Sequence, residues 1–235
     1  MTMATVPYID DGLARHLLDV HLPAEPAGAA VVMVIHGGSL RKLSKERMAG
    51  CSGQLARAGF VAVAPNYRLL DQADYPAPVD DVLAAFEWVR TGPPALGGAD
   101  VSRVGVLGAS AGSYLAQMMA AAVGASGLRC VVAVSGPSDV VHELPDGSRH
   151  CPLERVSPDW PPVLITHNRN DGIVSAAHAE KLHAALGRSG VANELFLYSR
   201  SETDHGIWAP GADPPEFLDF LQQRYDAFLS RHLAP

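Results

Sequence analysis

The chain has 235 residues, 48% of them hydrophobic, which is enough to bury the core of one α/β domain. Its 18 basic and 25 acidic residues give a net charge of −7, which opposes nonspecific attraction to nucleic acid and to anionic membranes. We therefore expect no nucleic-acid partner and no membrane partner, and we expect the ligand to be a small molecule.

The cysteines and the hydropathy pattern bear on the compartment. Cys51, Cys130 and Cys151 lie in or beside apolar segments, which argues against a disulfide framework and favours a reducing compartment. Residues 1–12 hold no basic region followed by an apolar stretch of signal-peptide length, and no apolar run reaches membrane-spanning length. These features predict a soluble cytoplasmic protein and leave its oligomeric state open, a homo-oligomer included.

Apolar runs typical of buried strands alternate along the chain with segments that have the hydrophobic period of helices. In chain order we expect strands at residues 17–22 and 29–35, a helix at 44–58, a strand at 60–64, a helix at 79–90, a strand at 104–107 and a helix at 111–123. Strands follow at 131–134 and 163–166, then a helix at 176–186, a strand at 194–198 and a helix at 216–229. This alternation predicts a single α/β domain with a mostly parallel central sheet, helices on both faces and no large cap.

The sharpest local pattern is Gly-Ala-Ser-Ala-Gly at residues 108–112, between a predicted strand and a predicted helix. It places Ser110 at the apex of a tight turn, where glycines on both sides let the strand and the helix pass without a clash of Cβ atoms. A serine hydroxyl held in this way is a candidate nucleophile, and it needs a base and an acid to activate it.

The base and the acid are expected at the carboxyl ends of later strands, where reactive groups gather in such sheets. Asp171 and His205 follow the last two predicted strands, in the chain order serine, acid, histidine. We therefore predict a catalytic triad of Ser110, Asp171 and His205. Asp139, after an earlier strand, is an alternative acid, and Asp204 adjoins the histidine but is poorly placed to face it.

The loop His36-Gly37-Gly38-Ser39 follows the strand at 29–35. Its glycines let backbone N–H groups approach a substrate oxygen. We expect the N–H groups of Gly38 and Ser39, with that of Ala111 after the nucleophile, to form an oxyanion hole. This chemistry needs no metal and no organic cofactor.

Together these motifs resemble the α/β-hydrolase fold, and more narrowly its branch of hormone-sensitive-lipase-like esterases, small carboxylesterases and kynurenine-formamidase-like enzymes. The resemblance covers nearly the whole chain and rests on residues 18–23, 36–38, 66–69 and 110–112, on Asp81 and on the loops of Asp171 and His205. It implies a serine hydrolase that cleaves a small carboxylic ester through an acyl-enzyme on Ser110. It also implies that Tyr67 and Arg68 support the oxyanion loop.

Two departures from the family pattern concern the shape of the acyl pocket. Ser39-Leu40-Arg41 follows the glycine pair where the family usually has glycine, tyrosine or a similar residue. Ser113 stands after Ser-Ala-Gly, where another glycine is common. Neither departure removes a catalytic side chain.

The triad does not encode the acceptor of the acyl group, so related reactions stay open. Amide or formamide hydrolysis, thioester cleavage, and acyl transfer or cyclisation in a biosynthetic pathway would use the same residues. A catalytically silent binding protein on this fold is a further alternative, against which the complete triad argues.

Basic residues cluster just beyond the predicted oxyanion loop, at Arg41, Lys42, Lys45 and Arg47. Such a cluster is typical of a solvated helix face, and it could also hold an acidic part of a substrate, with Arg41 as the candidate contact. Trp208, shortly after the predicted base, is a second candidate substrate contact.

Residues 137–162 contain six prolines and separate two predicted strands. A segment of this length is expected to act as a short lid or substrate loop and is too short for a large helical cap. It therefore predicts a fairly open pocket of modest size.

Overall fold

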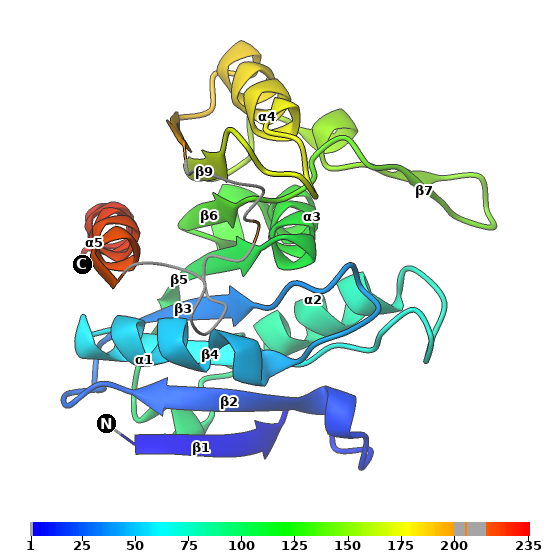
Figure 1. The fold of residues 1–235 in the computed structure, drawn as a ribbon. Helices are drawn as coiled ribbons and strands as arrows, with labels where there is room; N and C mark the ends of the chain where they lie inside the picture. Colours follow the sequence, from blue (N-terminus) through cyan, green and yellow to red (C-terminus); the bar gives the residue numbers. More distant parts are fainter. Residues whose placement is uncertain (1, 200–204, 206–214) are drawn as a thin grey trace.

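The computed structural model describes residues 2–199, 205 and 215–235, of which 215–219 are described by their backbone alone. Its centre is an eight-stranded sheet in the order β1-β2-β4-β3-β5-β6-β9-β10 (Figure 1). The strands are β1 Thr2–Pro7, β2 Leu17–Leu22, β3 Ala30–Ile35, β4 Val61–Pro65, β5 Asp100–Ala109, β6 Cys130–Val134, β9 Val163–Asn168 and β10 Asn193–Tyr198. Strand β2 runs antiparallel to β1 and β4, and every pair from β4 to β10 is parallel. The predicted fold class, a mostly parallel α/β sheet, is confirmed.

Helices cover both faces of this sheet (Figure 1). The helices are α1 Ala49–Arg57, α2 Ala77–Arg90, α3 Ala111–Gly127, α4 Ala177–Arg188 and α5 Pro215–His232. Buried side chains of α1 and α5 share one core cluster, and those of α2, α3 and α4 share the other. Within the described ranges, no helix combines the length and the apolar character needed to cross a lipid bilayer.

Strand β3 explains why both faces are covered. All six of its residues are buried, so it has no polar side to turn toward water. Val31, Met33 and Ile35 enter the core beneath α2, α3 and α4, whereas the alternate residues Ala30 and Val32 enter the core beneath α1 and α5. Period-two alternation of side chains thus places apolar groups on both faces of the central strand, and each face needs a helical layer.

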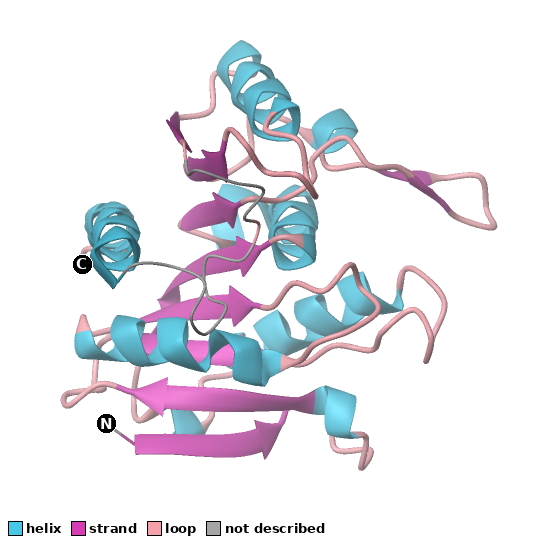
Figure 2. Ribbon diagram, in the orientation of Figure 1, coloured by secondary structure: helices cyan, strands magenta, loops and turns pink. Residues whose placement is uncertain are grey.

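The segment at residues 137–162 forms a small hairpin of β7 His142–Glu143 and β8 Arg149–His150, followed by one turn of 3-10 helix at Leu153–Arg155. The hairpin projects beyond the carboxyl ends of the parallel strands (Figure 2). No large cap lies in this segment.

Strand β1 is absent from the sequence-based prediction because it carries no pattern of burial. Five of its six residues are exposed, since it is the edge strand of the sheet. Main-chain pairing with β2 holds it in place, together with a 2.6 Å hydrogen bond from Thr5 Oγ1 to Asp19 Oδ1.

Lys45 is not part of a solvated face, so the expectation of a fully solvated basic cluster is wrong at this residue. It opens a 3-10 turn, Lys45–Met48, that precedes α1, and its side chain is buried. Its Nζ lies 2.8 Å from Asp19 Oδ1 and 3.0 Å from Glu46 Oε1. Burial alone would lower the pKa of Lys45, but these two carboxylates raise it, and the pair fixes the start of α1 to β2.

Backbone atoms of β3, β5 and α3 make close contact where the strand turns into the helix. A Cβ on Gly108 would lie 2.1 Å from the carbonyl oxygen of Gly112, and a Cβ on Gly112 would lie 2.1 Å from that of Ile35. Real Cβ atoms do not approach backbone so closely, so only glycine fits either position.

Replacement of Gly112 by alanine should therefore lower the free energy of unfolding by about 1–3 kcal/mol, the usual cost of overpacking. Gly50 in α1 is the matched control because a Cβ there meets no atom within 4 Å. Gly50→Ala should leave stability unchanged or raise it by up to about 1 kcal/mol. Urea unfolding of both variants checks this, and equal stability of the two would contradict the contact argument.

Candidate active site

Ser110 lies between the end of β5 and the first residue of α3 in a conformation that L-residues rarely adopt, with φ 55° and ψ −122°. Its N–H donates to the carbonyl of Val134 at 2.9 Å, and its own carbonyl accepts from Ser113 at 2.9 Å. These bonds fix the strained turn between β5 and α3, and the first of them ties it to the end of β6.

The structure brings together the three side chains of the predicted triad. Ser110 Oγ lies 2.6 Å from Nε2 of His205, and Nδ1 of the same ring lies 2.7 Å from Asp171 Oδ2. In this arrangement Nδ1–H donates to the carboxylate and the serine hydroxyl donates to Nε2. The histidine can therefore accept the serine proton while the carboxylate orients the ring.

Asp171 is held as a carboxylate. Its side chain is buried, and its Oδ1 accepts the N–H groups of Ile173 and Val174, each at 2.9 Å. Burial alone would raise its pKa, but hydrogen bonds from His167, His205 and these two amides outweigh burial and hold the pKa well below the usual range. The charge that orients His205 is thus present at any pH near neutrality.

Of the two alternatives to Asp171 as the acid, only Asp139 lies within the described residues. Asp139 is exposed and forms an ion pair with Lys181 at 2.5 Å, and no bond joins it to His205. Asp204 lies outside the described residues.

The loop after β3 has the geometry needed to present backbone N–H groups. Gly38 has φ 110°, and a Cβ there would lie 2.0 Å from the carbonyl oxygen of Lys42. Ser39 and Leu40 also have positive φ, near 55°. Among the described residues, none accepts a hydrogen bond from the N–H of Gly38 or Ser39. Ala111 N–H opens α3 and has no acceptor within the helix.

Tyr67 anchors this loop from below. Its buried hydroxyl donates to the carbonyl oxygens of His36 and Gly37, at 2.9 and 3.3 Å, and its ring stacks on that of His36 with centroids 4.2 Å apart. Arg68 pairs with the buried Asp81 through both Nε and Nη2. These contacts agree with the supporting role that the family resemblance implies for Tyr67 and Arg68.

A cavity of about 400 Å³ opens over the serine. It is lined by Ser39, Leu40, Arg41, Leu70, Ser110, Ala111, Tyr114, Pro137, Val140, His142, Ile173, Val174 and His178. Arg41 is thus at the cavity, whereas Trp208 lies outside the described residues. Within those residues, no group of three or more histidine, cysteine or carboxylate side chains could hold a metal ion.

Several of these wall residues were missed by the sequence analysis. Tyr114 had a usable signal, because it lies one helical turn after Ser110 and so faces the same side of α3. His142 and His178 had none, since only the tertiary fold brings the hairpin and α4 to the cavity. Ser113, a departure from the family pattern, does not line the cavity: it is buried and accepts a hydrogen bond from Gln117 at 3.1 Å.

A cluster of rings fixes the hairpin to the nucleophile helix. The hydroxyl of Tyr75 lies 2.8 Å from that of Tyr114 and 2.7 Å from Nδ1 of His150, and its ring stacks on His142 at 4.1 Å. Burial raises the pKa of Tyr75 to about 12. The hairpin that carries both histidines is therefore tied to α3 and forms a wall of the cavity.

Comparison with known proteins identifies a family and several relatives of this chain. The BD-FAE family model matches residues 18–146, more than half of the chain. Esterase LipI of Mycobacterium tuberculosis is 34% identical over 97 residues, 41% of this chain and 30% of that protein, so the match spans less than a third of this relative's length. Ethyl acetate hydrolase of Pseudomonas putida is 27% identical over 222 residues, 77% of this chain and 69% of that protein.

Among solved structures, the butyrate-bound esterase Est2 of Thermogutta terrifontis superposes with a TM-score of 0.84 at 20% identity, over 99% of this chain and 95% of that one. A truncated carbohydrate esterase from gut microbiota gives a TM-score of 0.80 at 22% identity, over 98% of this chain and 97% of that one. The predicted resemblance to α/β-hydrolases is confirmed.

The burial of His36, in the loop after β3, can be tested by the dependence of stability on pH. Burial lowers its pKa from 6.5 to about 4, against the effect of its hydrogen bond to Gly37. Between these pH values the unfolded chain holds the proton on His36 and the folded chain does not, so the contribution of His36 to the free energy of unfolding should fall as the pH drops from 6.5 to 4. The fall is about 1.4 kcal/mol per pH unit, or about 3 kcal/mol in total. NMR titration of this ring checks the assignment, and an apparent pKa near 6.5 would be incompatible with the buried site.

The assignment of the acid can be tested with a fluorophosphonate, which reacts with an activated serine hydroxyl. Asp171→Asn should slow labelling of Ser110 by about 10³–10⁴-fold, because the amide no longer holds the histidine in the required tautomer. Asp139→Asn is the control and should change the rate less than twofold. Equal slowing by the two substitutions, or slowing by the control alone, would show that the acid is misassigned.

Proposed function

We propose that this chain, which belongs to the BD-FAE family of α/β-hydrolases, is a serine hydrolase that cleaves small carboxylic esters. The observation that carries the proposal is the continuous line of hydrogen bonds from Ser110 Oγ through the ring of His205 to Asp171. This arrangement lets a serine hydroxyl attack a carbonyl carbon near neutral pH.

The proposed reaction proceeds in two halves. Ser110 Oγ bonds to the acyl carbon as its proton passes to His205 Nε2, and the N–H groups of Gly38, Ser39 and Ala111 stabilise the oxyanion. The tetrahedral intermediate then collapses, the alcohol leaves with the proton from the histidine, and an acyl-enzyme remains. Water attacks this ester with the same base, and release of the acid restores the serine. No step requires a metal or an organic cofactor.

The size of the cavity supports a small substrate. Its volume of about 400 Å³ lies at the low end for ligand sites, and His142 of the hairpin is among the residues that line it. The relatives are an esterase and an ethyl acetate hydrolase, and one structural neighbour holds butyrate, which supports a short acyl chain.

The three cysteines support a reducing compartment, and we propose the cytoplasm. Cys51, Cys130 and Cys151 are free and buried. Burial raises the pKa of Cys130 to about 12, so its thiol is not a reactive group.

Ser110→Ala tests the nucleophile directly. It should lower kcat/KM for a p-nitrophenyl short-chain ester by at least about 10³-fold, because the covalent route is lost, while circular dichroism and the unfolding transition stay those of the parent. Turnover at the parent rate in this variant would reject Ser110 as the nucleophile.

The same assay separates the related chemistries. A panel of matched esters, thioesters, amides and formamides should show the highest kcat/KM for the ester, and product analysis with added amines and alcohols measures acyl transfer. Faster turnover of a formamide or a thioester would replace the proposed substrate class and keep the triad. A parent protein that neither turns over any substrate nor reacts with a fluorophosphonate would favour a silent binding protein.

A further inference from the structure

The charge of the cavity lining is one-sided. Three of the residues that line it carry a basic side chain, Arg41, His142 and His178, and none of the described lining residues is an aspartate or a glutamate. This contrasts with the chain as a whole, whose net charge is −7. An anion that approaches the serine therefore meets the cationic Arg41 and no carboxylate of the described lining, although the protein as a whole is acidic.

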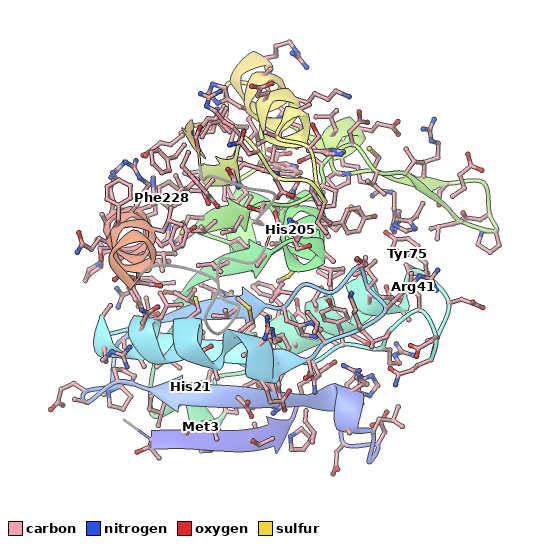
Figure 3. All side chains as sticks on the ribbon, in the orientation of Figure 1. Met3, His21, Arg41, Tyr75, His205 and Phe228 are labelled. Atoms are coloured by element: carbon pink, nitrogen blue, oxygen red, sulfur yellow. The ribbon has the colours of Figure 1, made fainter. Side chains whose placement is uncertain are left out.

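Arg41 is the strongest of these groups because it is charged at all working pH values. It follows the oxyanion loop directly, and its backbone N–H bonds to the carbonyl of Gly38 at 2.9 Å, which fixes its position relative to that loop. Figure 3 shows Arg41 beyond the carboxyl ends of the strands, with His205 nearer the centre of the molecule. Within the described part of the chain, the Arg41 guanidinium forms no ion pair, so no described carboxylate competes with a ligand for it.

Two further cations flank the same loop. Arg15 Nη1 donates to the carbonyl of Leu43 at 2.9 Å, and Lys42 is exposed beside Arg41. Neither forms an ion pair with a described acidic residue. Both lie beside the loop that carries Arg41, and neither lines the cavity.

His178 contributes a neutral donor from the other side. Its Nδ1 accepts the backbone N–H groups of Ser138 and Asp139, at 3.3 and 3.2 Å, so the ring proton resides on Nε2. Burial, the largest influence, lowers the pKa of this histidine and favours the neutral form. The edge that carries Nε2–H is the one opposite the backbone contacts, and the residue lines the cavity.

We propose that the preferred substrates carry a carboxylate near the scissile ester, and that Arg41 binds it. The proposal rests on the proposed esterase function and names its substrate class, short half-esters of dicarboxylic acids or esters of small hydroxy acids. The guanidinium can form two parallel hydrogen bonds with a carboxylate, which a neutral amide of the same shape cannot match. Arg41 is thus a residue that determines specificity, in addition to the triad.

The experiment compares substrates that differ only in this charge. For a carboxylate on the acyl side, the pair is monoethyl glutarate and ethyl glutaramate. For the alcohol side, it is 3-acetoxypropanoate and 3-acetoxypropanamide. The quantity measured is the ratio of kcat/KM for the anionic ester to that for its neutral partner. In the parent protein this ratio should exceed one for at least one pair, and that pair identifies the side on which the carboxylate lies.

Arg41→Gln should lower this ratio by about fivefold, the effect of losing one partly exposed ion pair. Lys42→Gln is the matched control, because Lys42 carries the same charge beside Arg41 but does not line the cavity, and it should lower the ratio less than twofold. Arg41→Lys should recover part of the preference through charge alone. A ratio that is the same in the parent and in Arg41→Gln, or that falls equally in Lys42→Gln, would overturn the proposal.

A binding measurement keeps this test independent of turnover. Calorimetry with glutarate and glutaramate should show tighter binding of the dicarboxylate, and this difference should be lost in Arg41→Gln. If no ester is hydrolysed but the difference in binding is found, the proposed function fails and the anion site stands. If esters are hydrolysed without any effect of charge on the ratio or on binding, the anion site fails and the esterase function stands.

Discussion

The site depends on the close approach of backbone segments around one serine. The ends of β3, β5 and β6 and the start of α3 meet at Ser110, and glycines occupy the positions where a Cβ would prevent the contact. A Cβ on Gly37 would lie 2.9 Å from Ser110 Cβ, and one on Gly136 would lie 2.2 Å from Ser113 Oγ. This contact brings the N–H groups after β3 beside the hydroxyl after β5, a juxtaposition that no single segment specifies.

Buried carboxylates fix the loops that surround this contact. Asp171 accepts hydrogen bonds from two amides and from the ring of His205, Asp81 holds Arg68 below the oxyanion loop, and Asp19 holds Lys45 at the start of α1. A buried carboxylate is stable only where donors replace its water, so each of these groups ties at least two segments together. Ser110, His205 and Asp171 are thereby held in a fixed arrangement before any ligand binds, which is what the proposed catalysis requires.

The central strands and the turn at Ser110 could be predicted from the sequence because their signals are local. The buried runs of β3, β4, β6 and β9 are apolar on both faces, and Ser110 lies in a motif that encodes its own turn. The position of Asp171 and His205 followed from one topological rule, that parallel strands place their carboxyl ends at one edge. Strand β1 could not be predicted, because an exposed edge strand has no hydrophobic pattern to detect.

The environments of individual charged residues could not be predicted from the sequence. In the sequence, Lys45 cannot be told apart from its basic neighbours Arg41 and Lys42. Its partner Asp19 is 26 positions away, and only the packing of α1 against β2 brings Lys45 and Asp19 together. The cavity wall is a similar case, since His142 and His178 come from a hairpin and a helix that carry no motif. Recognition of the substrate is thus the part of the function that depends most on tertiary structure.

A crystal structure of the protein after reaction with paraoxon tests the central claim most directly, because it reports both the nucleophile and the oxyanion donors. We expect a covalent bond from phosphorus to Ser110 Oγ. We also expect the phosphoryl oxygen within about 2.7–3.1 Å of the backbone nitrogen of Ala111 and of at least one of Gly38 and Ser39. Phosphorylation of another residue, or a phosphoryl oxygen turned away from these amides, would contradict it.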